Sequence, residues 1–436
     1  MLSYQIHPND RASVARSLSL SLYQFDRLVQ AANHAYEVIK ELGPFYGREE
    51  VKEPTFRITA EPVILPKEAK EILETFGQDC LHLAKALQKL PDEAKNQLGK
   101  ELDFRVPPTW RIDVILDEKG NPRVNEIEGM DGANALMMAE QLAYNLQDLS
   151  DSTAAKLIPT LKTICGSSEK LVKIALIRLD SPHNANAQRF IHFLEVLSHE
   201  SLKVEYIDEN SLLEGSVVPN WAKYSGIILE TSFPPQKLYK VGLPKEKVIS
   251  NGVYNALGNK GVFALLFEKG LQNFWTDNLG LERYRRLKNI LIPTSFITTQ
   301  EELQKAREKG KVVKVSWAGE NGYLINRSKG VALPEESVEQ GSEERWNLLS
   351  ALLKQGVKMV VQDFVVPARI PSFLRKKGTN LELVNWYNRI CVKYVVEGRP
   401  NDSLIPTVAM TAAEATLGPD IVPAGRKCAF TAVKFS

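Results

Sequence analysis

The sequence of 436 residues is poor in cysteine and has no closely spaced cysteine pair. Its four cysteines, Cys80, Cys165, Cys391 and Cys428, lie far apart, and none belongs to a CxxC motif. A structural zinc cluster is therefore not expected. Scattered thiols in a chain of this length are typical of a reducing compartment, and we interpret them as small buried side chains.

The sequence also lacks long hydrophobic runs and a large excess of charges of one sign. No apolar segment approaches the roughly 18 residues of a membrane-spanning helix. The N-terminal segment lacks the apolar core of a signal peptide, because Asp26 and Arg27 follow its short Leu/Ser run. The 55 basic residues nearly balance the 53 acidic ones, so no global field attracts nucleic acid or an anionic membrane. These features predict a soluble, cytoplasmic protein with neither a membrane nor a nucleic-acid partner.

The composition is that of a globular protein, with 44% hydrophobic and 25% charged residues. At roughly 150 residues per domain the chain is long enough for two or three folded units. Apolar residues at three- and four-residue steps predict helices over residues 12–42 and 66–90. Residues 1–100 are therefore expected to form an N-terminal helical region, for which we see no functional signal.

Residues 172–250 change to alternating strands and a helix. Strands are predicted at 173–179, 204–208 and 226–230, with a helix over 186–198. This order predicts a βαβ unit with a parallel sheet, and hence an α/β fold class. No GxGxxG motif follows the first strand, which weakens the alternative of a Rossmann-type oxidoreductase. That alternative predicts stabilisation by NAD(P) and not by ATP.

The most informative segment is a predicted hairpin of residues 111–128. If Lys119 and Gly120 form its tip, Asp113 faces Glu126 and Arg111 faces Glu128. Because side chains alternate along a strand, these four point to one side of the hairpin.

Three carboxylates on one sheet face repel one another unless the arginine, a metal ion or both compensate them. Oxygen-only ligands suit Mg²⁺, which commonly also binds substrate phosphates. The alternative is a solvated acidic face with an Arg111–Glu128 surface ion pair.

Two lysines are candidate phosphate ligands. Lys314 lies within the apolar run Val312–Val315 and precedes a glycine-containing loop that includes Gly319 and Gly322. Such a loop can present backbone N–H groups to phosphates. Lys260 lies at the start of a predicted helix, a position that favours anions. The alternatives are an edge-strand lysine in a simple hairpin and a solvated lysine.

In order, the chain has R-x-D-(x12)-E-x-E, an N-K pair before a Leu-rich helix, V-V-K-V with G-E-N-G, and V-V-Q-D-F. This order resembles a circularly permuted ATP-grasp enzyme of the glutathionylspermidine-synthetase type. The resemblance implies an ATP-grasp-like fold. In that fold residues 101–150 would form a permuted segment with the acidic metal hairpin, and residues 172–250 would form a domain like the one that precedes the ATP-grasp domain. Residues 251–436 would form the nucleotide-binding domain.

The resemblance also implies roles for single residues. Asp113, Glu126 and Glu128 hold Mg²⁺, and Arg111 steadies the transferring phosphoryl group or acyl phosphate. Lys260 and Lys314 contact the phosphates of ATP beneath a flap from Gly319 to Gly322. The adenine and ribose edge comprises Gln362, Asp363 and Val365, and Arg389 is a further candidate for substrate or phosphate. The chain departs from the family in having Glu128 in place of asparagine and Val315 in place of proline.

Two functions follow from the resemblance. The first is an ATP- and Mg²⁺-dependent carboxylate–amine ligase that acts through an acyl phosphate on small-molecule carboxylate and amine substrates. The second is a non-catalytic nucleotide-binding or scaffold protein, which Glu128 in place of asparagine favours. The sequence identifies neither substrate and does not fix the oligomeric state.

Overall fold

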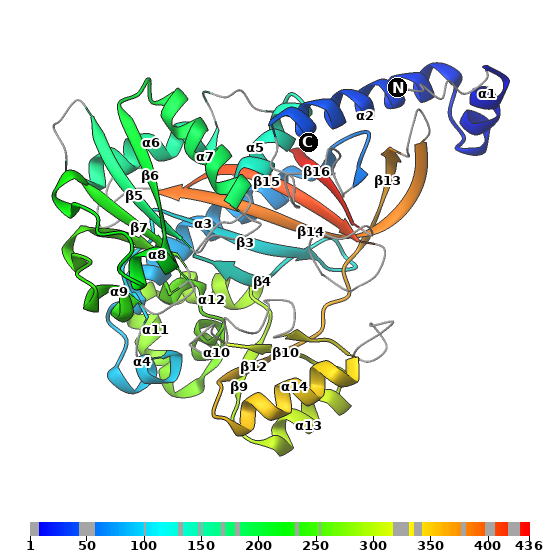
Figure 1. The fold of residues 1–436 in the computed structure, drawn as a ribbon. Helices are drawn as coiled ribbons and strands as arrows, with labels where there is room; N and C mark the ends of the chain where they lie inside the picture. The colour runs from blue at the N-terminus through cyan, green and yellow to red at the C-terminus, as the bar shows by residue number, and fades with distance from the viewer. Residues whose placement is uncertain are drawn as a thin grey trace.

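The computed structural model describes residues 8–42, 57–99, 102–129, 134–146, 150, 152–166, 171–178, 184–231, 235–252, 254–316, 331–334, 342–375, 381–396, 406–416 and 428–436. The described strands form three sheets, and helices cover them (Figure 1). The predicted α/β fold class is confirmed, because one sheet is parallel with helical crossovers and the other two are largely antiparallel. None of the described helices combines the length and apolar character needed to cross a lipid bilayer.

The largest sheet has the order β1-β16-β15-β14-β3-β4, with β13 paired to β14 and β2 paired to β16. Its strands are β1 (Arg57–Ile58), β2 (Val63–Leu65), β3 (Thr109–Leu116), β4 (Pro122–Glu128), β13 (Arg369–Arg375), β14 (Leu381–Val396), β15 (Pro406–Thr416) and β16 (Cys428–Phe435). Segments from residues 57–128 and from residues 369–435 therefore share one sheet. The prediction of a strand over residues 389–396 captures only the second half of β14.

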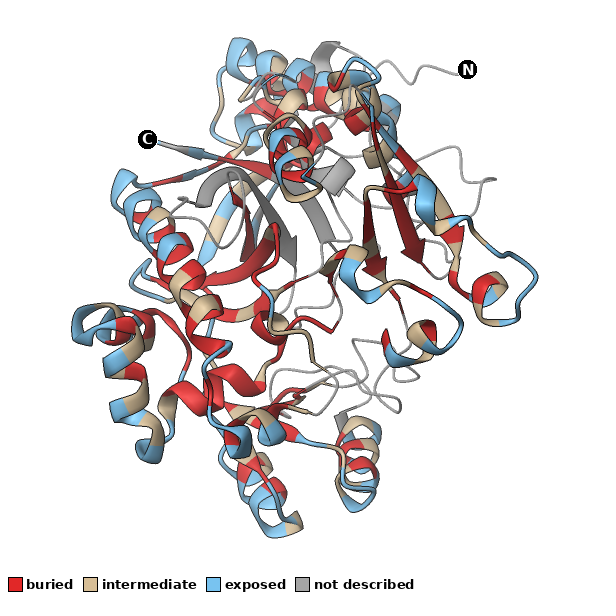
Figure 2. Ribbon diagram, turned by 90° about the vertical axis from the view of Figure 1, so that its left-hand side faces the viewer, coloured by how far each residue is buried: buried red, intermediate tan, exposed pale blue. Residues whose placement is uncertain are grey.

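One face of this sheet is apolar and packs on helices. Trp110, Ile112 and Val114 of β3 belong to a buried cluster with Ile390 and Tyr394 of β14. Helices α3 (Lys67–Leu87), α4 (Asp92–Leu98), α10 (Gly261–Phe267), α11 (Gln272–Leu279) and α12 (Leu281–Ile290) contribute to the same cluster. Figure 2 shows buried residues in red on central strands and on the inward sides of helices, with exposed residues on the outer sides of the helices. Each fully buried large apolar side chain contributes about 1.5–3 kcal/mol, so this face fixes β3 and β14 in place.

The second sheet is parallel, with the order β6-β5-β7-β8. It comprises β5 (Val172–Arg178), β6 (Leu202–Asp208), β7 (Gly226–Glu230) and β8 (Val248–Asn251). The helices α5 (Asn134–Ala143), α6 (Thr153–Ile164), α7 (Asn184–Leu197), α8 (Glu209–Leu213) and α9 (Pro235–Lys240) accompany it. The predicted strands β5, β6 and β7, the helix α7 and the parallel pairing are confirmed. Strand β8 was not predicted.

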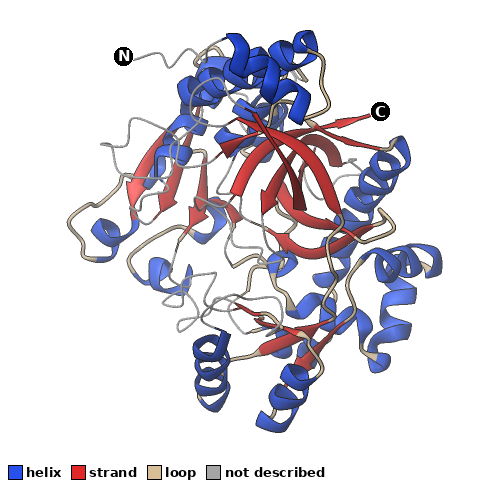
Figure 3. Ribbon diagram, turned by 90° about the vertical axis from the view of Figure 1, so that its right-hand side faces the viewer, coloured by secondary structure: helices blue, strands red, loops and turns tan. Residues whose placement is uncertain are grey.

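The third sheet is small and antiparallel, with the order β11-β10-β12-β9. It contains β9 (Thr294–Ile297), β10 (Val312–Val315), β11 (Val331–Ala332) and β12 (Met359–Gln362), with α13 (Gln300–Glu308) and α14 (Ser342–Lys354) against it. Figure 3 shows this group below the other two sheets. Strand β10 has a neighbour on each side, so Lys314 is not on an edge strand.

The N-terminal segment contains two helices, α1 (Pro8–Ser17) and α2 (Leu22–Leu42), where a single helix over residues 12–42 was predicted. That prediction is wrong because the chain turns at Ser19, whose φ is 58°. Ser21 then begins α2 as a capping box: its hydroxyl accepts from Gln24 N at 3.2 Å, and its backbone N–H donates to Gln24 Oε1 at 3.0 Å. The helix predicted over residues 66–90 is confirmed as α3.

Candidate functional site

The hairpin of β3 and β4 has the predicted register at its acidic end. Arg111 pairs with Glu128 and Asp113 with Glu126. Beyond Asp113 the register shifts by one residue, so Val114 pairs with Val124 and Asn125 is the extra residue of a β-bulge. The four charged side chains therefore share one face, opposite the apolar face that packs on α3.

The three carboxylates converge. One oxygen of each of Asp113, Glu126 and Glu128 lies within 4.8 Å of the other two. Asp113 is buried, and the side chains of Glu126 and Glu128 are only about one fifth exposed, at 21% and 20%. The acidic face is therefore largely withdrawn from solvent, although the Arg111–Glu128 ion pair of the alternative interpretation is present.

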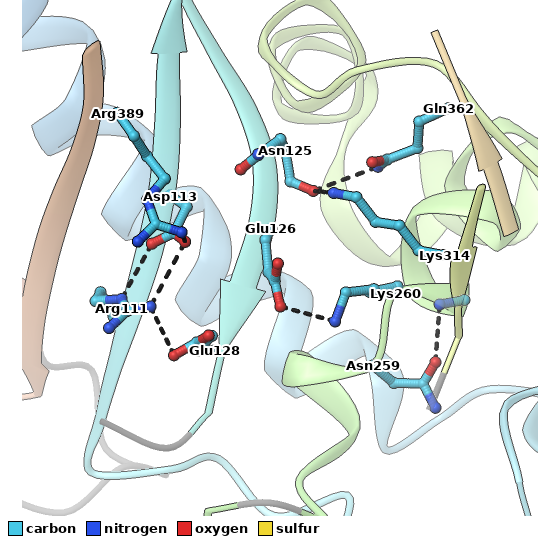
Figure 4. A network of polar contacts seen from close by, with 11 residues as sticks. Arg111, Asp113, Asn125, Glu126, Glu128, Asn259, Lys260, Lys314, Gln362 and Arg389 are labelled. Carbon is cyan, nitrogen blue, oxygen red and sulfur yellow. Dashed lines mark hydrogen bonds and ion pairs between the residues drawn. The ribbon is translucent and has the colours of Figure 1, made fainter. Parts of the chain in front are cut away.

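Arginines from two strands neutralise one end of this cluster (Figure 4). Arg111 donates from Nε to Asp113 Oδ1 at 3.0 Å and forms an ion pair through Nη2 with Glu128 Oε2 at 2.8 Å. Arg389 of β14 places Nη1 3.2 Å from Asp113 Oδ2. Both guanidinium groups are buried beside the carboxylates, where a charged pair is stronger than at the surface.

Lysines approach the other end from outside the hairpin. Lys260, which immediately precedes α10, places Nζ 2.7 Å from Glu126 Oε1. Lys314 of β10 donates to the backbone carbonyl of Asn125 at 3.1 Å, so the bulge provides the oxygen that holds this lysine. The backbone N–H of Lys260 donates to Ser316 O at 3.0 Å, which ties the two lysine segments together.

Asn259 and Gln362 hold the lysine segments in position. The side chain of Asn259 accepts from Gly261 N at 2.8 Å and donates to Leu98 O at 3.0 Å. Gln362 Nε2 donates to Thr294 Oγ1 at 3.0 Å and to Asn125 O at 3.4 Å. Gln362 therefore lies beside Lys314 and shares its acceptor.

The charges of the site shift two pKa values. Burial alone would raise the pKa of Glu126, but the positive charges of Lys260 and Lys314 lower it to about 2. Burial lowers the pKa of Lys314 to about 8; Glu126 opposes this shift and Lys260 adds to it. Glu126 is therefore an anion at neutral pH, and Lys314 changes its charge near pH 8.

Eight of the predicted site residues meet here, two of the described ones do not, and two lie outside the described residues. Asp363 is half exposed and forms an ion pair with Lys311 at 2.6 Å, away from the carboxylates. Val365 lies in the segment after β12, and no polar contact links it to the cluster among the described residues. Gly319 and Gly322 lie outside the described residues, as does the predicted flap.

Three residues of this environment were not predicted. Asn125 provides the carbonyl at the bulge, and Cys391 places Sγ 3.5 Å from Asp113 Oδ1. Lys393 of β14 is fully buried and pairs in register with Arg111. The sequence could have indicated Lys393, because it is a lysine within an apolar strand, as is Lys314. No sequence pattern marks Asn125 as a bulge.

The comparisons with known proteins concern the fold. No family model and no curated protein sequence matches the chain. Among solved structures, it is similar to a glutathione synthetase-like effector from Globodera pallida in its apo form, with a TM-score of 0.58, 11% identity, and coverage of 94% of this chain and 97% of that one.

A second similar structure is a candidate gamma-glutamylcysteine synthetase from Methylobacillus flagellatus KT. It is 10% identical to this chain and covers 79% of this chain and 82% of its own. Its TM-score of 0.39 is too low to establish a shared fold. The first comparison shows that this chain has a glutathione synthetase-like fold.

Proposed function

We propose that this protein is an ATP- and Mg²⁺-dependent carboxylate–amine ligase that acts through an acyl phosphate. The observation that carries the proposal is the convergence of three carboxylates from one hairpin with two lysines from other elements. A triphosphate and its metal need this combination of oxygen ligands and cations. The fold agrees with it, because the Globodera protein is described as glutathione synthetase-like.

The donor set fits Mg²⁺. Asp113, Glu126 and Glu128 offer only oxygen ligands, and their nearest oxygens lie within 4.8 Å of one another. A bound Mg²⁺ would neutralise phosphate charge during transfer. We assign these three residues as its ligands.

The other side chains of the site would bind and orient the reactants. Lys260 and Lys314 would contact the phosphates, and Arg111 and Arg389 would steady the transferring phosphoryl group. The two arginines are already held against Asp113 by a hydrogen bond and an ion pair, so they would reorganise little during the reaction. The same proposal assigns the adenine and ribose edge to Gln362, Asp363 and Val365. It assigns a flap over the phosphates to Gly319 and Gly322.

The chain order supports a circularly permuted ATP-grasp enzyme of the glutathionylspermidine-synthetase type. The acidic strands β3 and β4 precede the lysine strand β10 in the sequence, although the two groups meet in space.

In the proposed reaction, a substrate carboxylate oxygen attacks the γ-phosphorus of ATP, and ADP leaves. An amine then attacks the acyl carbon of the acyl phosphate, and inorganic phosphate leaves with formation of an amide bond. The protein supplies no covalent nucleophile in this scheme. Its contribution is to position the reactants and compensate their charge.

The carboxyl ends of the parallel strands adjoin the acidic hairpin and are a suitable place for the substrates. A Cβ on Gly129, next to Glu128, would lie only 3.1 Å from Gly252 O, directly after β8. Ligands of open parallel sheets bind at this end of the strands. Arg178 and Glu230 form an ion pair there at 3.0 Å, and these groups suit the carboxylate and ammonium of an amino acid or peptide.

The proposal is tested by measuring ADP release with Mg·ATP and a panel of carboxylates, each with and without an amino-acid or polyamine acceptor. We expect release that needs Mg²⁺, one carboxylate and one amine together. A protein that binds ATP yet releases no ADP with any mixture would instead support the non-catalytic scaffold, which Glu128 in place of asparagine favours.

ATP affinity is expected to fall as the pH rises above about 8, because Lys314 then loses the charge that binds phosphate. The loss would approach about tenfold per pH unit while the bound form keeps its proton. Calorimetric titration with ATP from pH 7 to 9.5 measures it. Lys314→Arg should flatten the profile, because a guanidinium stays charged in this range; identical profiles for the two proteins would contradict the assignment.

A further inference from the structure

The candidate site contains more positive than negative side chains. The cations are Arg111, Arg389, Lys260 and Lys314, and the carboxylates are Asp113, Glu126 and Glu128. All seven lie in the network of Figure 4. A small cation that approaches this network therefore meets a net positive charge.

Each carboxylate already has a cation in direct contact. Lys260 Nζ lies 2.7 Å from Glu126, Arg111 Nη2 lies 2.8 Å from Glu128, and Arg389 Nη1 lies 3.2 Å from Asp113. A metal ion that binds Glu126 Oε1 must displace Lys260, and one that binds Oε2 is repelled by the ammonium group beside it. Displacement would leave Lys260, like Lys314, without a carboxylate in direct contact, which is costly in a poorly solvated site.

Lys314 is the cation of the site that no carboxylate contacts directly, although Glu126 partly compensates its charge from a distance. Its side chain is only 6% exposed, and its ammonium donates to a neutral backbone carbonyl, Asn125 O. In the part of the chain that the structure describes, no carboxylate lies within 4.0 Å of it. An ammonium has three donors, so Lys314 keeps both charge and hydrogen-bonding capacity for an anion.

We propose that the site binds a polyphosphate anion first and a divalent metal only afterwards. This order rests on the proposed function, because the anion is taken to be the triphosphate of the nucleotide. The anion compensates Lys314 and draws Lys260 away from Glu126, which frees a carboxylate for the metal. Because the two binding events are thermodynamically linked, the bound metal increases the affinity for the anion. The factor is the same as that by which the bound anion increases the affinity for the metal.

Two non-hydrolysed probes test the order in the full-length protein. Tripolyphosphate is titrated calorimetrically in EDTA, and protein-bound Mn²⁺ is measured by equilibrium dialysis with and without saturating tripolyphosphate, as the excess of Mn²⁺ in the protein chamber over the Mn²⁺ and Mn²⁺–tripolyphosphate on the protein-free side. We expect tripolyphosphate to bind without metal, and Mn²⁺ to bind at least about tenfold more tightly with the anion than without it. Equal Mn²⁺ affinity in both conditions, or no anion binding in EDTA, would overturn the proposal.

Lys260→Met tests the displacement step. Without the lysine on Glu126, Mn²⁺ alone should bind about tenfold more tightly than to the wild type, while tripolyphosphate binds more weakly. Lys223→Met is the matched control, because it removes an equally short Lys–Glu pair, with Glu205 at 2.7 Å, in the parallel sheet. The control should leave both affinities unchanged.

An unchanged or weaker affinity of Lys260→Met for Mn²⁺ alone would contradict the displacement step. These measurements need no turnover. A protein that shows the binding order but never releases ADP would contradict the ligase activity and leave the order standing.

Discussion

Replacing Glu126 by alanine is expected to abolish Mg²⁺-dependent ADP release. Glu126 lies centrally in the site, within 4.8 Å of the other two carboxylates and 2.7 Å from Lys260. The substitution removes a metal ligand and the counter-charge of two lysines together. We expect a loss of at least about 100-fold in turnover, measured as ADP release at saturating Mg·ATP.

Glu205→Ala is the matched control, because Glu205 also carries a short lysine ion pair but lies in the parallel sheet. It should retain wild-type turnover. Glu126→Gln keeps the side-chain shape and should also lose activity, while its melting temperature shows that the fold is intact. Near wild-type turnover in a folded Glu126→Gln protein would contradict the role of this carboxylate.

Gly77→Val is expected to destabilise the protein by about 3 kcal/mol, because the contact between α3 and β14 has no room for a side chain. A Cβ on Gly77 would overlap with Tyr394 Cε1. Tyr394 cannot move away easily: it is fully buried, its hydroxyl donates to Leu73 O at 2.8 Å, and it stacks on Trp110. Because β14 also carries Arg389, displacement of the strand would disturb the site.

Gln78→Val is the control that separates the effect of the lost packing space from the effect of valine on helix propensity. Gln78 is exposed on the same helix, so this variant has the same β-branched residue in a helix without the contact to Tyr394. Its cost should stay below about 1 kcal/mol. The free energy of unfolding is measured by denaturant titration of both variants, and equal losses would contradict the packing argument.

The hairpin at the site could be predicted from the sequence because its determinants are local. A short turn and alternating side chains fix the register, so the pairs Arg111–Glu128 and Asp113–Glu126 are confirmed. The bulge could not be predicted in the same way. Asn125 is displaced from the ladder where Lys314 and Gln362 contact its carbonyl, and those contacts come from a distant part of the chain.

The rest of the site depends on pairing between distant segments. Cys391 and Asp113 are 278 positions apart, and only the β3–β14 pairing brings Arg389 onto Asp113. Periodicity within either strand carries no information about this pairing. The inner position of β10, which buries Lys314, likewise follows from sheet order and not from the sequence of the strand.

The measurement that tests the account most directly is a crystal structure with Mn²⁺ and a non-hydrolysable ATP analogue. The anomalous signal of Mn²⁺ locates the metal independently of the protein model. We predict a peak coordinated by carboxylates among Asp113, Glu126 and Glu128, with Lys260 and Lys314 turned to the phosphates. A metal and nucleotide bound away from this hairpin would contradict the assignment.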